Sequence, residues 1–184
     1  MNGISFEGTY IYSQLHNNQT MPSKIVSDCS KALSQQKLTI AFAESASAGR
    51  FASEFSLTAD SGTVLKGGIV SYDAEVKEQV LEIPASFIEK FSPESAEVTK
   101  EMAFRLKDLV KSDIQVAITG LTTAGGSEDA HKPVGTIFIH ILIHDNSIAL
   151  KETFKGSAED IVLQALDFTA RVILNEVVSL NQYS

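Results

Sequence analysis

Three apolar segments that each end in small polar residues constrain the fold of this chain most strongly. The segments and the residues that follow them are 38–43 with Glu44 and Ser45, 65–70 with Ser71 and Tyr72, and 114–118 with Thr119 and Gly120. Their β-branched residues favour strands, and stretches with helical periodicity lie between them. Strands that alternate with helices are typical of a sheet covered on both faces. We therefore expect a single α/β domain, a three-layer α/β/α sandwich with a mixed β-sheet.

Caps and turn residues predict the remaining elements. The tripeptide Ser-Pro-Glu at 92–94 predicts the start of a helix, with Ser92 as the cap and proline at the first helical position. Ser157 and Asp160 have the spacing of a capping-box variant, which predicts the start of the last helix. Residues 145–147 separate two apolar runs and indicate a β-hairpin.

Length, composition and charge restrict the class of protein. Of the 184 residues, 43% are hydrophobic and 21% are charged, as in a globular domain. Residues 1–21 are polar and irregular in pattern, so we expect an extension there and the folded domain at 22–184. The net charge of −8 argues against a nucleic-acid partner, because phosphate neutralisation needs clustered Lys and Arg. Cys29 is the only cysteine, so no intramolecular disulfide is possible and a reducing compartment is expected. No apolar stretch approaches the ~20 residues of a membrane span, and no signal-peptide pattern opens the chain, so we expect no membrane partner and a cytoplasmic location.

Ser45 is the candidate nucleophile. It lies where a strand passes into a helix, beside backbone N–H groups that can stabilise an oxyanion. A hydroxyl also needs a base, and neither a G-x-S-x-G nor an S-x-x-K pattern surrounds this serine. From the residues alone, the simpler interpretation is that Ser45 caps a helix and Lys77 is a solvated surface lysine.

The loop after the third apolar segment is the natural place for phosphate or ribose recognition. Gly125 and Gly126 let backbone N–H groups approach an anion, and Lys132 adds positive charge. Most such loops are only turns, and no phosphate-binding P-loop pattern is present. His140 and His144 would lie ~13 Å apart along one strand, so we expect no metal site.

Four sequence blocks together resemble a known family. They read AESASAG at 43–49, SYDAEVK at 71–77, TGLTTAGG at 119–126 and KPVGT at 132–136. These are similar to the AESCTGG, T/S-Y-x-x-E-x-K, TGIAGP and KPVGT blocks of the C-terminal domain of the competence/damage-inducible protein A family, CinA. The resemblance covers about residues 23–180.

The resemblance implies an activity and a set of site residues. Stand-alone members of the family are nicotinamide mononucleotide deamidases, which convert a carboxamide to a carboxylate and ammonia. Carried over, the nucleophile is Ser45 and the base is Lys77, a Ser-Lys dyad that is coherent if burial keeps the lysine amine neutral. The same blocks imply substrate contacts from Glu44, Ala46, Ser47, Gly49, Tyr72, Thr119, Gly120, Gly125, Gly126 and Lys132. The resemblance further implies a small-molecule carboxamide of the pyridine nucleotide type as substrate, a homo-oligomer and no cofactor.

The chain departs from the family pattern at its functional blocks. The first block lacks the cysteine and one glycine, and the third lacks a glycine and a proline. Gly67 stands where many members carry arginine, and residues 156–158 read Gly-Ser-Ala in place of Gly-Asp-Arg. Arginine is the usual residue for bidentate phosphate contact. If the family's arginines hold the nucleotide phosphate, this chain should bind mononucleotide weakly or prefer another ligand. The alternative function is therefore a catalytically inactive member that binds a nucleotide-like ligand or a protein, although retention of Ser45 and Lys77 favours the enzyme.

Overall fold

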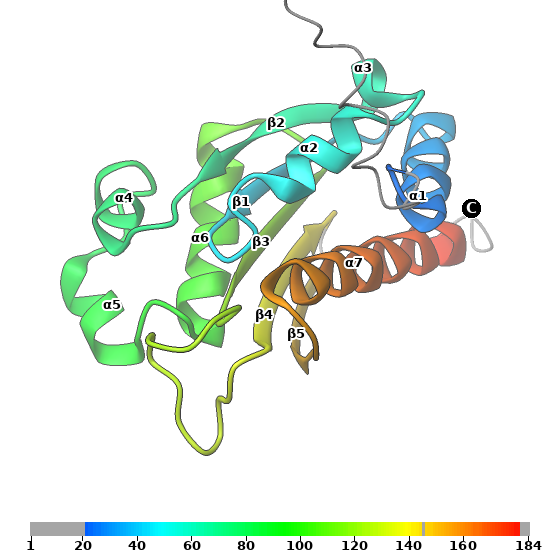
Figure 1. The fold of residues 1–184 in the computed structure, drawn as a ribbon. Helices are drawn as coiled ribbons and strands as arrows, with labels where there is room; N and C mark the ends of the chain where they lie inside the picture. The colour runs from blue at the N-terminus through cyan, green and yellow to red at the C-terminus, as the bar shows by residue number, and fades with distance from the viewer. Residues whose placement is uncertain (1–20, 145, 181–184) are drawn as a thin grey trace, which may run out of the picture.

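The computed structural model describes residues 21–144 and 146–180, so nearly all of the expected extension at 1–21 lies outside the described residues. Figure 1 shows the arrangement of the elements along the chain. In order they are α1 (Lys24–Gln35), β1 (Ile40–Glu44), α2 (Arg50–Ser56), α3 (Ser61–Val64), β2 (Leu65–Val70), α4 (Ala74–Gln79), α5 (Ala85–Phe91), α6 (Ala96–Leu109), β3 (Ile114–Gly120), β4 (Thr136–Ile143), β5 (Asn146–Thr153) and α7 (Ala158–Leu180).

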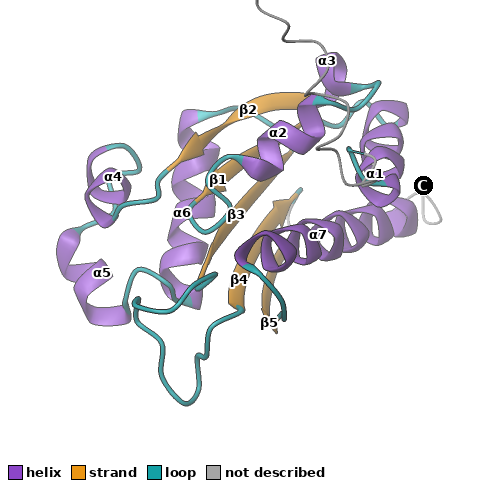
Figure 2. Cartoon of the chain, in the orientation of Figure 1, coloured by secondary structure: helices purple, strands orange, loops and turns teal. Residues whose placement is uncertain are grey.

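The five strands form one mixed sheet in the order β2-β1-β3-β4-β5. β1 is parallel to β2 and β3, whereas β4 is antiparallel to both β3 and β5. Helices cover both faces, with α1, α2 and α7 on one side and α6 on the other (Figures 1 and 2). The predicted three-layer sandwich with a mixed sheet is therefore confirmed.

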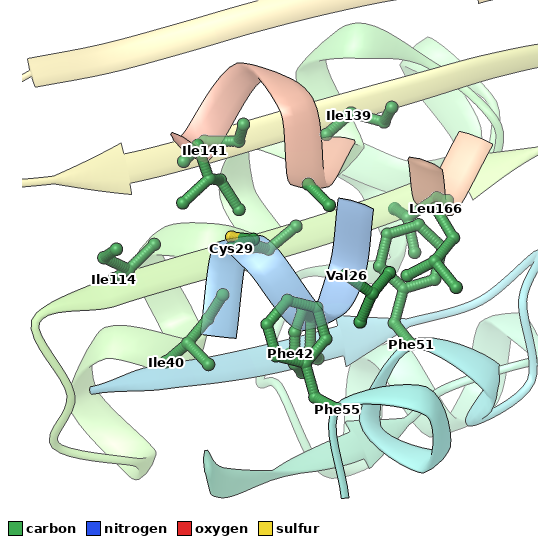
Figure 3. Close-up of a cluster of buried hydrophobic side chains, with 14 of the residues drawn as sticks. Val26, Cys29, Ile40, Phe42, Phe51, Phe55, Ile114, Ile139, Ile141 and Leu166 are labelled. Carbon is green, nitrogen blue, oxygen red and sulfur yellow. The ribbon is translucent and has the colours of Figure 1, made fainter. Parts of the chain in front are cut away.

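The two faces of the sheet bury different kinds of side chain. In β1, Ile40 and Phe42 face the core that is shared with α1, α2 and α7, and Ala41 and Ala43 face α6. Figure 3 shows the first core, where Cys29 lies among branched and aromatic side chains. Burial raises the pKa of the Cys29 thiol to about 12, so this cysteine is part of the core and not a reactive thiolate.

One predicted helix start is confirmed and another is wrong. At the start of α7, the Ser157 N–H donates to Asp160 Oδ2 at 2.8 Å and the Asp160 N–H donates to Ser157 Oγ at 3.2 Å, which forms the expected capping box. The helix predicted to start at Ser92 begins later, at Ala96, because the Ser95 hydroxyl caps it. Glu94 consequently lies in the loop before α6 and not in its first turn.

Parallel pairing brings the predicted strand ends together. Glu44 at the end of β1 pairs with Val70 at the end of β2 and with Ile118 near the end of β3. The loop between β3 and β4 projects from this same region (Figure 2). Separately, none of the described helices is both long and apolar enough to cross a membrane.

Candidate active site

Glu44 organises the turn that carries the candidate nucleophile. Its carboxylate is buried and accepts four hydrogen bonds from the segment that follows it. The donors are the Ser47 hydroxyl at 2.6 Å and the backbone N–H groups of Gly49 at 3.0 Å, Phe51 at 3.1 Å and Ala52 at 2.8 Å. Glu44 therefore contacts its own chain, and its role is to hold the turn after β1 in one conformation.

The turn leaves two amides beside Ser45 without a hydrogen-bond partner among the described residues. Phe51, Ala52 and Phe55 predict a helix that begins near Ser47, but α2 begins at Arg50 and residues 46–49 form turns before it. The Ala48 N–H donates to the Ser45 carbonyl at 3.1 Å, but the N–H groups of Ala46 and Ser47 donate no hydrogen bond to any described residue. Unpaired N–H groups next to a nucleophile are the usual donors of an oxyanion hole.

The Lys77 side chain extends from α4 to the Ser45 hydroxyl. It is 1% exposed. Its Nζ lies 3.0 Å from Ser45 Oγ, and it donates to the Ser71 carbonyl at 2.8 Å and to the Tyr72 carbonyl at 3.4 Å. A neutral amine has two N–H groups and one lone pair, so the two carbonyls can take the N–H groups while the lone pair faces the Ser45 hydroxyl.

The surroundings of Lys77 favour the neutral amine. Burial lowers the pKa of Lys77 below its ordinary value of 10.5, and the carboxylates of Glu94 and Asp73 offset part of this shift. The lysine is therefore a better proton acceptor near neutral pH than a solvated lysine is.

An open pocket of about 190 Å³ lies over Ser45. Six of the expected site residues line it: Ser45, Ala46, Tyr72, Gly120, Gly125 and Gly126. The pocket is also lined by Glu94 and by residues 121–124, which belong to the loop expected to recognise phosphate or ribose. Glu94 was missed because residues 92–94 predicted a helix start.

The other expected contacts lie behind the pocket surface. Ser47 and Gly49 donate to Glu44 within the turn, and the Thr119 hydroxyl pairs with the Thr99 hydroxyl at 2.7 Å between β3 and α6. Lys132 Nζ donates to Ser92 Oγ at 3.0 Å, to the Glu94 carbonyl at 2.9 Å and to Ser127 Oγ at 2.6 Å. Since an ammonium has three donors, these bonds use all of them to hold the loop together, and Lys132 is not among the residues that line the pocket.

Gly120 is the position in the pocket wall that tolerates a side chain least. Its φ of +153° disfavours other residues, and an added Cβ would lie 2.5 Å from the Thr136 carbonyl oxygen and 2.9 Å from Ile137 Cα. We expect Gly120→Ala to lower the free energy of unfolding by about 2–4 kcal/mol, measured by urea denaturation. The matched control is Gly62→Ala, whose Cβ would meet no atom within 4 Å; an equal effect of both variants would contradict the prediction.

The described residues contain no group of three or more His, Cys, Asp or Glu side chains that could hold a metal ion. His140 is buried and its Nε2 lies 2.9 Å from Ser147 Oγ. Burial, and to a smaller extent Lys100, lowers the pKa of His140. This neutral, hydrogen-bonded histidine is accounted for by its packing under α6.

The fold and the buried serine–lysine contact define a class of protein: an α/β domain with a candidate nucleophile at the carboxyl ends of its parallel strands. The chain matches the family described as the CinA C-terminal domain over residues 22–177, and it belongs to that family. The resemblance found from the four sequence blocks is therefore confirmed.

The chain matches one part of longer relatives. CinA-like proteins from Petrotoga mobilis and Flavobacterium psychrophilum are each 36% identical to it, over 79% and 80% of this chain. The matched regions are 36% and 35% of those proteins, so the chain spans about a third of the length of these curated relatives.

Solved structures of the family have the same fold. A competence-damaged protein (CinA) superfamily protein from Klebsiella pneumoniae matches with a TM-score of 0.79 and 25% identity, over 84% of this chain and 96% of that one. The corresponding superfamily protein from Escherichia coli matches with a TM-score of 0.75 and 26% identity, over 82% and 88% of the two chains.

Proposed function

We propose that the protein is an amide hydrolase of the nicotinamide mononucleotide deamidase type, in which Ser45 is the nucleophile and Lys77 is the base. The observation that carries the proposal is the 3.0 Å separation of Lys77 Nζ and Ser45 Oγ, with both side chains buried under an open pocket. A lysine is rarely buried without a specific role, because burial disfavours its charged form.

The proposed reaction uses the dyad in two stages. Neutral Lys77 takes the hydroxyl proton while Ser45 Oγ bonds to the carboxamide carbon, and the resulting oxyanion accepts hydrogen bonds from the N–H groups of Ala46 and Ser47. The oxyanion then collapses, and the Lys77 ammonium gives its proton to the departing amine, which leaves as ammonia. In the second stage Lys77 takes a proton from water, the hydroxide attacks the ester, and the proton returns to Ser45 as the carboxylate product departs.

Ammonia release tests the proposal directly. Purified protein is incubated with nicotinamide mononucleotide and, separately, with its phosphate-free riboside, and ammonia is measured for the unaltered chain and for Ser45→Ala. We expect release that the substitution abolishes, whereas Ser53→Ala at an exposed position of α2 retains it. Folded protein that releases no ammonia but binds either compound would support the non-catalytic ligand-binding module instead.

The pH dependence follows from the state of Lys77. Only the neutral amine accepts a proton, so below the Lys77 pKa the value of kcat/KM should rise about tenfold per pH unit and then level off. Because burial lowers this pKa, we expect the plateau to begin below pH 10.5. The measurement is kcat/KM for ammonia release across the pH range in which the protein stays folded; a rate that falls as pH rises toward that plateau would contradict Lys77 as the base.

The homo-oligomer implied by the family resemblance stays a prediction. β2 and β5 are the two edge strands of the sheet, and an unpaired edge is a place where a second chain can add. Light scattering coupled to size-exclusion chromatography measures the mass of the assembly and decides the question.

A further inference from the structure

The pocket over Ser45 is acidic. No arginine or lysine is among the described residues that line it, whereas the Glu94 carboxylate does line it. The Ser127 hydroxyl donates to Glu94 Oε2, and no ion pair among the described residues includes this carboxylate. The Lys132 ammonium donates to the same Ser127 hydroxyl from outside the lining, so Glu94 is the only charged side chain among the described lining residues that a ligand meets directly.

The glycine loop offers little of its expected anion-binding capacity. The Gly125 N–H donates to the loop's own Glu128 carboxylate at 2.7 Å. This bond is the main cause of a lowered Glu128 pKa, with a smaller contribution from the Gly126 N–H. The carboxylate thus occupies the Gly125 N–H, one of the donors at which we expected a phosphate.

The cations nearest to the site in sequence are also engaged. All three donors of the Lys132 ammonium serve Ser92, Glu94 and Ser127. Arg50, which follows the nucleophile turn, pairs with Glu54 at 2.7 Å and with Glu159 at 3.4 Å. Neither Lys132 nor Arg50 lines the pocket, so a phosphate that enters it would meet Glu94 without a basic lining residue to pair with.

We propose that the pocket is selective for a cationic carboxamide without phosphate, a pyridinium riboside in preference to the mononucleotide, and that Glu94 is the residue that determines this preference. The inference rests on the proposed deamidase function and names its substrate class. The Glu94 carboxylate attracts the positive pyridinium ring and repels a phosphate. Thr122 and Thr123, which also line the pocket, supply neutral hydroxyls that suit the hydroxyls of a ribose.

The test compares kcat/KM for ammonia release from nicotinamide riboside and from nicotinamide mononucleotide, two substrates that differ by the phosphate alone. In the unaltered protein we expect the riboside to be favoured about tenfold or more. Glu94→Gln should reduce this ratio about tenfold, and Glu128→Ala should raise kcat/KM for the mononucleotide by freeing the Gly125 N–H. The ratio is the decisive readout, because any effect of Glu94 on the Lys77 base applies equally to both substrates.

Glu89→Gln is the matched control, since Glu89 is exposed on α5 and does not line the pocket. Equal or faster turnover of the mononucleotide by the unaltered protein overturns the inference, as does an unchanged ratio in Glu94→Gln. If neither compound releases ammonia, the deamidase proposal fails. The preference for the riboside is then tested by measuring the binding of the two compounds by calorimetry. The inference is supported if the riboside binds more tightly than the mononucleotide and Glu94→Gln weakens riboside binding. It is overturned if the two compounds bind equally, if the mononucleotide binds more tightly, or if neither binds.

Discussion

Replacing Lys77 by methionine should lower kcat/KM for ammonia release by about a thousandfold or more, the scale on which enzymes lose rate when a nucleophile loses its base. Methionine fills a similar volume, but it has no lone pair that can take the Ser45 proton. It also has no positive charge to protonate the departing amine. The measurement is the steady-state rate with the preferred carboxamide substrate, together with urea denaturation to show that the variant is folded.

A double variant distinguishes a true dyad from two separate contributions. If Ser45 and Lys77 act as one unit, Ser45→Ala combined with Lys77→Met should be no slower than either single variant. Lys66→Met is the matched control, because Lys66 is exposed on β2. More than a tenth of the activity left in Lys77→Met would exclude this lysine as the base and direct attention to another proton acceptor near Ser45.

Replacing Glu44 by alanine should lower the free energy of unfolding by about 3–5 kcal/mol. The reason is that four donors lose their acceptor at once, and each buried donor left unpaired costs about 1–3 kcal/mol before water or relaxation compensates part of it. Activity should be lost as well, because the turn that places Ser45 and its neighbouring amides depends on this carboxylate. Urea denaturation and ammonia release are the two measurements.

Glu44→Gln separates charge from acceptor geometry. Glu44 Oε2 accepts from Ser47, Gly49 and Phe51, and Oε1 accepts from Ala52. The glutamine oxygen can take the place of Oε2 and keep three of the four hydrogen bonds. Its NH₂ group then faces the Ala52 N–H, and two donors cannot bond to each other. We therefore expect a loss of stability between that of the unaltered protein and that of Glu44→Ala. Glu89→Ala is the exposed control, and a loss in Glu44→Ala no larger than in this control would show that the turn holds its shape without the carboxylate.

Much of the fold could be predicted because its signals are local. Branched apolar runs mark the strands, and the Ser157–Asp160 spacing marks the start of α7. The helix start at Ser92 was misplaced because two serines, Ser92 and Ser95, each offer a plausible cap. In the structure the Ser95 hydroxyl accepts from the Val98 N–H, so Ser95 is the cap and Ser92 lies outside the helix.

The candidate site, like the fold, could be predicted only in part from the sequence. Parallel strands align their carboxyl ends, so the order of the three strand ends is enough to expect Ser45 and residues 119–120 at one edge of the sheet. Family resemblance alone paired Ser45 with Lys77 from the sequence, since nothing in the local pattern distinguishes this lysine from a solvated one. Glu44 was expected to contact substrate, but its four hydrogen bonds within the turn give it a structural position instead.

The sequence by itself determined the α/β class, the strand ends that carry polar residues, and membership of the CinA C-terminal family through its four blocks. Only the tertiary structure decided that Lys77 is buried against Ser45, that Glu94 lines the pocket, and that Glu128 accepts from the Gly125 N–H of the glycine loop. The physical reason is that strand formation and capping depend on neighbours in the chain. Burial, pKa and the charge of a pocket depend on side chains that come together only when distant segments pack.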